Sequence, residues 1–161
     1  MEGSQQMTEL LFRDDAYLKS ATASVISISE HGGLVFDRSI FYPNSGGQSG
    51  DVGEIIWPQG NVCVIENTVK TEKGFPLLIA RKDEALPSVG TTCDQFINWE
   101  KRYRHMRMHT AQHLLSGIVY ESFNGARTVG NQIHEDRSRI DFQPIKFDDE
   151  MIELIFGLAQ E

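Results

Sequence analysis

The sequence predicts an α+β protein in which a small antiparallel β-barrel is followed by a subdomain built around one long helix. Short β-rich segments separated by turn residues fill the first part of the chain, and such spacing favours a barrel. The pattern then changes, because residues 99–123 contain no proline and a single glycine, Gly117. We therefore expect two subdomains, residues 1–97 with a glycine-rich loop and residues 98–161 with the long helix. We expect the second to be incomplete at its C-terminal end.

The strands of the barrel are predicted from β-branched residues and from the alternation of apolar with polar side chains. Turns break this pattern at residues 31–33, 58–61 and 71–74, each of which contains glycine. The predicted strands are residues 21–29, 34–36, 51–57, 62–69, 75–80 and 91–97.

The long helix is predicted from apolar residues that recur at spacings of three and four. Asn98 precedes the pattern as a typical N-cap, and Asn124 followed by Gly125 is typical of a helix end. The apolar residues that supply the spacing are Tyr103, Met106, Ala111, Leu114, Leu115, Ile118 and Val119.

Two further strands and a second helix are predicted beyond the long helix. Residues 128–133 and 138–142 are predicted strands that flank a polar turn at Glu135 and Asp136. Asp148 is a typical N-cap for an amphipathic helix, whose apolar pattern still continues at Glu161. We interpret the end of the chain as a truncation within this helix.

Composition indicates a globular protein without a membrane-spanning segment. Hydrophobic residues make up 40% and charged residues 24% of the 161 residues, values close to the globular average. No apolar run approaches the ~20 residues needed to span a bilayer, and residues 1–6 lack the apolar stretch of a secretory signal. We therefore expect a cytoplasmic protein in which Cys63 and Cys93 are buried thiols rather than a disulfide.

The charge distribution permits a nucleic-acid partner without predicting one. The net charge of −8 argues against such a partner. Residues 98–113, however, hold four basic residues against Glu100, a local balance of +3. These residues could contact RNA phosphates or form an ordinary solvated flank of the helix. The four basic residues are Lys101, Arg102, Arg104 and Arg107.

Two histidines indicate a metal site on the long helix. His109 and His113 are four residues apart, so they lie on one face about 6 Å apart along the helix axis. Zinc favours imidazole ligands and requires three or four in total. The spacing alone is also typical of a surface pair, and His105, one turn earlier, fits a supporting, RNA-facing or solvated role. A metalloprotease is disfavoured because Thr110 stands where the HExxH motif has its glutamate.

A glycine-rich loop at residues 41–51 is the second candidate site. Gly46 and Gly47 permit positive φ angles and close approach of the backbone to a ligand. Gln48 could then place its amide in a pocket. The loop is not a phosphate-binding GxxxxGK motif, because no lysine follows the glycines. An ordinary glycine-rich turn is the alternative.

These two motifs together resemble the editing domain of alanyl-tRNA synthetase and the free-standing alanyl-tRNA editing proteins of the AlaX type. The likeness covers nearly the whole chain in matching order and implies a translation-factor-like β-barrel joined to a metal-bearing α+β subdomain. The residues that carry it are Phe41, Tyr42, Pro43, Gly46, Gly47 and Gln48, the run 109–115 (HTAQHLL), and the flanking segments 37–39, 99–102 and 139–142.

The resemblance implies that His109 and His113 bind zinc. In that family the other ligands are a cysteine and a histidine separated by three residues, further along the chain. This sequence contains no such pair, and we expect it beyond Glu161. Two imidazoles hold zinc weakly, so we expect weak or absent zinc unless His134, another chain or solvent completes the shell.

The implied reaction is hydrolysis of the ester that joins a wrong amino acid, serine or glycine, to alanine tRNA. Gln48, His109 and His113 are the implied catalytic residues. Gly46, Gly47 and Gln48 would position the aminoacyl group. Ser39 falls where relatives carry a threonine thought to sense the serine hydroxyl. The basic residues of the helix would contact the tRNA backbone.

Three other interpretations stay open at this point. The same fold could edit another tRNA, because the histidine pair also resembles that of threonyl-tRNA synthetase editing domains. It could bind tRNA or a protein without catalysis, which the missing ligand pair favours. A small-molecule metal hydrolase is disfavoured, because no carboxylate lies at a base position near the histidines. Self-association is compatible with each of these interpretations.

Overall fold

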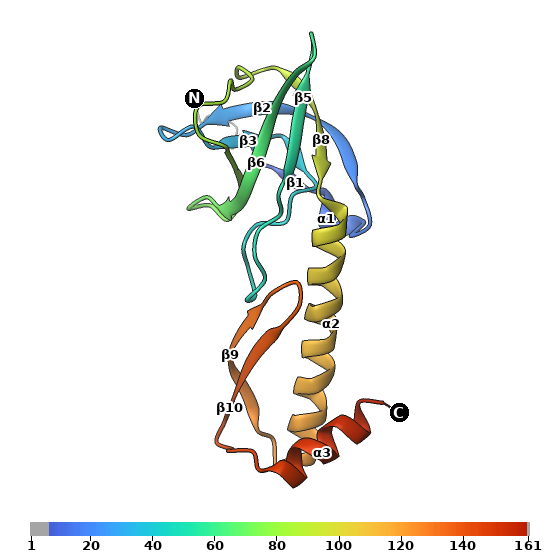
Figure 1. Ribbon diagram of the computed structural model, residues 1–161. Coiled ribbons are helices and arrows are strands. Elements are labelled where there is room, and N and C mark those ends of the chain that lie inside the picture. The colour runs from blue at the N-terminus through green and yellow to red at the C-terminus, as the bar shows by residue number, and fades with distance from the viewer. Residues whose placement is uncertain (1–6, 161) are drawn as a thin grey trace. The chain divides into compact units, whose positions relative to one another are not determined.

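The computed structural model describes residues 7–160, which divide into two compact units (Figure 1). Unit 1 contains the residues up to Ser45 together with Ser49–Arg102. Unit 2 contains Gly46–Gln48 together with the residues from Tyr103 onward. The chain therefore passes between the units at three places, two of them within the glycine-rich loop.

The division differs from the predicted subdomain boundary in two respects. Residues 98–102 group with unit 1, so the division within the long helix falls after Arg102. A boundary after residue 97 leaves Gly46–Gln48 with the barrel, whereas in the structure these residues group with unit 2. Their contacts with other residues of unit 2, described below, give the reason. The expectations about residues 1–6 and about Glu161 lie outside the described residues.

Unit 1 is built on a closed barrel in which every neighbouring pair of strands is antiparallel (Figure 1). The ring closes through the pairing of Ser20–Ile28 with Thr92–Ile97, so these strands leave no open sheet edge. The predicted α+β fold with an N-terminal antiparallel barrel is confirmed. Around the barrel the strands are β2 (Ser20–Ile28), β3 (Leu34–Phe36), β7 (Pro76–Ala80), β6 (Asn61–Lys70), β5 (Gly53–Trp57) and β8 (Thr92–Ile97).

Three short elements of unit 1 were not predicted from the sequence. β1 (Glu9–Leu10) pairs in parallel with β4 (Arg38–Ser39). One helical turn, α1 (Leu11–Asp14), follows β1 directly. Two- and four-residue segments are too short to show a periodicity of 2 or 3.6 residues, which explains why the pattern missed them.

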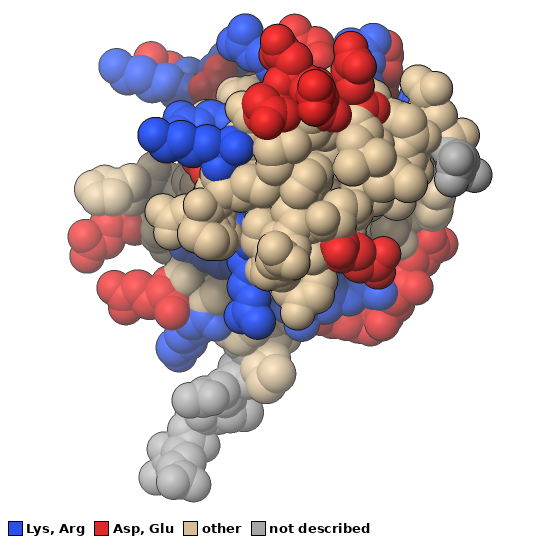
Figure 2. All heavy atoms as spheres, turned by 90° about the horizontal axis from the view of Figure 1, so that it is seen from below, with Lys and Arg blue, Asp and Glu red and all other residues tan. Residues whose placement is uncertain are grey.

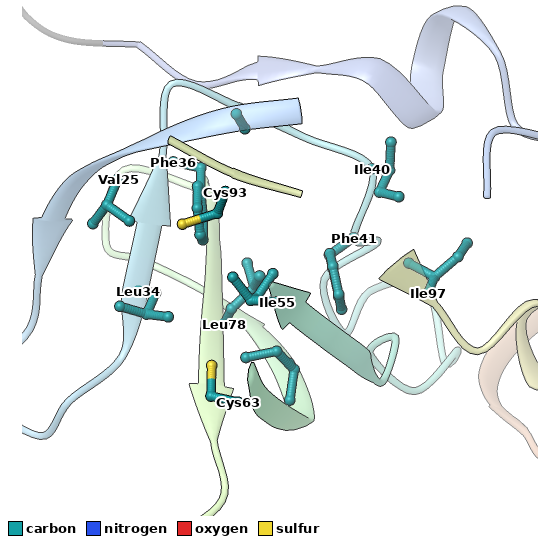
Figure 3. Close-up of a cluster of buried hydrophobic side chains, with 12 residues drawn as sticks. Val25, Leu34, Phe36, Ile40, Phe41, Ile55, Cys63, Leu78, Cys93 and Ile97 are labelled. Atoms are coloured by element: carbon teal, nitrogen blue, oxygen red, sulfur yellow. The ribbon is translucent and has the colours of Figure 1, made fainter. Parts of the chain in front are cut away.

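Alternation along the strands places the core inside the barrel (Figure 3). In β8, Cys93, Gln95 and Ile97 are buried while the residues between them are exposed. Gln95 is fully buried, so its amide needs partners. It accepts a hydrogen bond from the Ile40 N–H (3.1 Å) and donates to the Arg38 carbonyl (3.1 Å). A polar side chain of the barrel thereby holds the segment that leads into the glycine-rich loop.

Cys63 and Cys93 are free thiols buried in this core, as expected (Figure 3). Burial raises the pKa of the Cys63 thiol to about 12 and that of the Cys93 thiol to about 11. The thiolate is the reactive form of cysteine. Both residues therefore act as small apolar core groups and not as nucleophiles.

Both thiols are predicted to resist alkylation in the folded protein. At pH 8 a thiol with a pKa of about 12 is roughly 10⁻⁴ ionised, and neither side chain is exposed to solvent. Iodoacetamide followed by mass spectrometry should show almost no native adduct, and two adducts in urea. Rapid modification of either cysteine at low denaturant would contradict the described burial.

Unit 2 combines most of the long helix with a β-hairpin and a second helix (Figure 1). The hairpin lies beside the long helix, where Ser116 Oγ and Thr128 Oγ1 are 2.8 Å apart. None of the helices among residues 7–160 combines the length and apolar character needed to cross a bilayer. The elements are α2 (Trp99–Ser122, which begins in unit 1), β9 (Arg127–Ile133), β10 (Ser138–Gln143) and α3 (Asp149–Leu158).

The helix ends follow the predicted capping residues. The Lys101 N–H donates to Asn98 Oδ1 (3.1 Å) at the start of α2. At its end, Asn124 and Gly125 adopt positive φ angles of 50° and 75°. The Asp148 side chain accepts a hydrogen bond from the Met151 N–H (2.9 Å) and so caps α3.

The buried face of α2 differs from the predicted apolar face. The buried residues are Arg102, His105, Gln112 and Val119, three of which are polar. By contrast, the exposed fraction is 54% for Leu114. Periodicity correctly predicted the helix but not its buried face, on which Arg102 pairs with Asp51.

The α3 helix has no buried residue. Its first turn is acidic, and four large apolar side chains beyond it are exposed. Figure 2, which views the molecule from below, shows a broad area without charged side chains and acidic groups along part of its margin. The exposed apolar residues are Ile152, Leu154, Phe156 and Leu158.

Candidate functional site

The stem of the glycine-rich loop is closed within unit 1 by reciprocal hydrogen bonds. The Asp51 N–H donates to the Tyr42 carbonyl (2.9 Å), and the Tyr42 N–H donates to Asp51 Oδ2 (2.8 Å). Two bonds to Thr68 fasten the stem to β6: the Asn44 N–H donates to the Thr68 carbonyl, and Thr68 Oγ1 donates to the Asp51 carbonyl. The ends of the loop are therefore fixed on the barrel.

Asp51 forms a buried ion pair with Arg102, in the first turns of α2. Each residue is 3% exposed. The guanidinium also donates to the Ile40 carbonyl (3.4 Å) and lies 5.5 Å and 6.0 Å from the ring centroids of Tyr42 and Phe12. Burial raises the pKa of the Asp51 carboxyl, while the Arg102 charge and the Tyr42 N–H favour its ionised form.

The tip of the loop is attached to β9 within unit 2. The Ile133 N–H donates to the Gly47 carbonyl (2.9 Å), and the Asn131 amide donates to the Gly46 carbonyl (3.0 Å). Gly46 and Gly47 have φ angles of 59° and 81°, a region that side chains disfavour. A Cβ on Gly47 would lie 2.5 Å from Asn131 Oδ1. Both conformation and space therefore require glycine at this position.

Substitution of Gly47 is predicted to displace the loop tip. Gly47→Ala would add backbone strain and a clash with Asn131, so we expect a loss of about 1–3 kcal/mol in the free energy of unfolding. Gly74→Ala is a matched control, because Gly74 also has a positive φ but its Cβ would meet nothing within 4 Å. Urea denaturation measures both. Equal losses would show that the Asn131 contact contributes nothing.

Gln48 and His109 form the central contact of the site. Gln48 is 3% exposed, and its Oε1 lies 3.0 Å from His109 Nδ1. An amide oxygen only accepts hydrogen bonds, so Nδ1 carries the hydrogen and Nε2 of the neutral ring keeps its lone pair. Burial, followed by the neighbouring His113, lowers the pKa of His109 and favours this neutral form.

His113 stacks on His109 one turn further along α2. The ring centroids are 4.9 Å apart and the planes differ by 15°. A Cβ on Gly46 would lie 3.5 Å from His109 Cε1 and 3.8 Å from Nε2. The absence of a side chain at Gly46 thus leaves the Nε2 edge accessible.

This arrangement fits one half of a metal site. An imidazole held at one nitrogen by a second residue, with its other nitrogen available, is the usual form of a metal-binding histidine. Zinc needs further ligands. Among residues 7–160, however, no three His, Cys, Asp or Glu side chains come together to hold a metal ion, so His134 does not complete the set.

Comparison with known proteins gives the family. A family described as class II (A) tRNA synthetases matches residues 8–101, more than half of the chain. This chain belongs to that family, as an AlaX-like editing domain. The chain is 38% identical, over 96% of its length, to the alanyl-tRNA editing protein AlaX-M of Methanosarcina mazei, and covers 63% of that relative.

Relatives with lower identity include a longer alanyl-tRNA editing protein and an alanine–tRNA ligase. The domain is 32% identical to the alanyl-tRNA editing protein AlaX-L of Pyrococcus horikoshii, over 84% of this chain and 33% of the relative. It is 32% identical to the alanine–tRNA ligase of Staphylothermus marinus, over 96% of this chain and 17% of the ligase. The chain spans about three fifths of the length of the AlaX-M relatives that it matches.

Of the other residues considered for the site, Ser39 and Arg102 belong to unit 1 and His105 belongs to unit 2. Ser39 is in unit 1 and fully buried, and its Oγ accepts a hydrogen bond from the Phe41 N–H (3.1 Å). Arg102 is buried against Asp51, so the prediction that it contacts RNA is corrected to a structural role. His105 is 2% exposed, which also removes the RNA-facing interpretation.

Three of the four basic residues assigned to RNA binding remain accessible. Arg104 and Arg107 are exposed on α2, and Lys101 is partly exposed. Arg104 also pairs with Glu135 of the hairpin turn (3.7 Å).

Two functional contributions were missed from the sequence. Asp51 closes the loop, although in the sequence it is only the last residue of the segment 41–51. Asn131 anchors Gly46, and nothing in the β9 sequence distinguishes it from a surface asparagine. The burial of Arg102 on α2 could not be predicted either, because an arginine within a run of basic residues is usually solvated.

Proposed function

We propose that this chain is the editing domain of a protein that hydrolyses wrongly charged serine or glycine from alanine tRNA, in a reaction that depends on zinc. The observation that carries the proposal is the contact between Gln48 of the glycine-rich loop and His109 of α2. It joins the two motifs that define the family resemblance. The names of the relatives, alanyl-tRNA editing proteins, support the same reaction.

His109 and His113 are proposed to provide two ligands to the zinc ion. When bound, zinc would supply Lewis-acid polarisation of water or of the ester carbonyl. Gln48 fixes the tautomer and the orientation of the His109 ring. Gly46 leaves backbone without a side chain beside His109, where an aminoacyl group could approach closely, and Gly47 would hold the adjoining turn against Asn131.

Hydrolysis is predicted to depend on the two histidines and on Gln48. The assay measures release of a tritium-labelled amino acid from alanine tRNA that has been charged with serine, glycine or alanine. Release should be fastest for the two wrong amino acids, serine and glycine. Chelation, His109→Ala and His113→Ala should reduce release to background, and Gln48→Leu should reduce it ~10–100-fold, the usual cost of losing a group that orients a metal ligand.

His134→Ala is the matched control for this assay, because His134 is an exposed histidine of unit 2 and belongs to no cluster of possible metal ligands within residues 7–160. Its activity should equal that of the unaltered protein. Turnover that survives both histidine substitutions and the chelator would contradict the proposal.

A binding module without catalysis is the second candidate. It is favoured by the lack, among residues 7–160, of a third metal ligand near the histidine pair. The two candidates differ when zinc is supplied in excess. An editing enzyme releases amino acid from Ser-tRNA under this condition, whereas a binding module retains tRNA affinity without release.

Accessible basic residues of α2 are proposed to contact the tRNA backbone. Neutralising one phosphate contact should lower the slope of log K against log salt by ~0.7–0.9. Arg107→Gln should therefore weaken tRNA binding at low salt and reduce this slope, as measured by filter binding. Arg81→Gln in unit 1 is the control, because Arg81 already pairs with Glu66 and Glu84. An unchanged slope for Arg107→Gln would remove that residue from the interface.

A further inference from the structure

We propose that Tyr120 and Arg127 form a binding site for an unpaired nucleotide at the end of the tRNA that carries the amino acid. A base stacks on the exposed Tyr120 ring, and the Arg127 guanidinium binds an adjoining phosphate. The inference rests on the proposed function, because it takes the ester to lie at His109 and His113. All four residues belong to unit 2.

Tyr120 presents an aromatic ring to solvent near the C-terminal end of α2. The residue is 49% exposed. The Gly125 N–H donates to the Tyr120 carbonyl (2.9 Å), which fixes the turn that follows the helix. A Cβ on Gly125 would lie 3.5 Å from Cε2 of the ring, so the ring lies close to this turn. The ring is therefore supported on one side, while much of its surface stays open to a ligand.

Arg127 places a positive charge beside this ring. It is the first residue of β9, which begins next to the C-terminal end of α2 (Figure 1). Its side chain is exposed, and Cζ lies 6.0 Å from the centroid of the Tyr120 ring. Unpaired RNA bases stack on exposed aromatic rings, and arginine binds the phosphates of the backbone. The two residues together match the flat base and the negative charge of one nucleotide.

The ring and the histidine pair share one face of α2. His113, Gly117 and Tyr120 follow one another at spacings of four and three residues, which makes them neighbours on the helix surface. Tyr120 lies about 10 Å from His113 along the helix axis. An ester at the histidines therefore brings the nucleotides next to it within reach of Tyr120.

Gly117 supplies an independent reason to expect a ligand on this face. Glycine in the interior of a helix lowers the stability of the helix relative to alanine. Gly117 has no positive φ angle, and a Cβ there would meet nothing within 4 Å among the described residues. Neither conformation nor packing within the described chain therefore requires this glycine. The missing side chain leaves bare helix between His113 and Tyr120, where an RNA strand can lie against the backbone.

The test compares two RNAs that carry no amino acid: alanine tRNA, and the same tRNA without its unpaired 3′-terminal nucleotides. Filter binding at low salt gives the Kd of each. Tyr120→Ala should weaken binding of the intact tRNA ~5–100-fold, the usual contribution of one stacked base, and leave the Kd of the shortened tRNA unchanged. Tyr120→Phe keeps the ring and should bind both RNAs as the unaltered protein does.

Two further variants test the glycine and the charge. Gly117→Gln should raise the urea midpoint, because glutamine is the better helix former, and should nevertheless weaken binding of the intact tRNA. Arg127→Gln should lower the slope of log K against log salt by ~0.7, for the intact tRNA alone.

Tyr103→Ala is the matched control. Tyr103 is a tyrosine of the same helix that is 42% exposed, and it lies about 25 Å from Tyr120 along the axis. Its substitution should preserve the difference in Kd between the two RNAs.

The possible outcomes separate this site from the proposed reaction. The stacking site is wrong if Tyr120→Ala leaves the Kd of the intact tRNA unchanged or weakens both RNAs equally. If Tyr120→Ala does not fold, Tyr120→Leu gives the decision, because leucine is apolar but has no aromatic face. Unchanged binding by Gly117→Gln would show that RNA does not lie along this face, which also overturns the proposal.

The unaltered protein provides the remaining comparison. If it binds the two RNAs equally, no site for the unpaired end exists. If it prefers the intact tRNA and loses this preference in Tyr120→Ala, but releases no amino acid from Ser-tRNA, the binding site stands and the proposed function fails.

Discussion

The hydrogen bond between Gln48 and His109 links residues that are 61 positions apart in the chain, and the candidate site depends on it. Because the amide oxygen can only accept, this single contact determines which nitrogen of His109 carries the hydrogen. It therefore determines which nitrogen is available for a ligand. The bond also explains why the tip of the glycine-rich loop groups with unit 2 while its stem stays with the barrel.

Buried polar side chains, more than the apolar core, hold the loop in place. Gln95 fixes the segment before the loop, and Asp51 with Arg102 closes its stem. A buried polar group without partners is costly, so each of these residues restricts the backbone around it to positions that satisfy its hydrogen bonds. The apolar barrel supplies stability, and these polar contacts supply the precise course of the chain.

The family match and the structure cover different parts of the candidate site. The match to class II (A) tRNA synthetases covers residues 8–101, which include the loop but not the histidine pair. The structure adds that pair, stacked one turn apart and joined to the loop through Gln48. Among the described residues, no third His, Cys, Asp or Glu side chain joins the pair to hold a metal ion.

Local sequence determined the elements, and tertiary structure determined how they are used. The barrel strands, α2 with its Asn98 cap and α3 with its Asp148 cap follow from alternation, periodicity and capping, which are properties of neighbouring residues. The buried role of Arg102 and the anchoring of Gly46 by Asn131 could not be predicted, because each depends on a partner distant in sequence. A charge or an amide looks the same in a sequence whether water or a buried partner satisfies it.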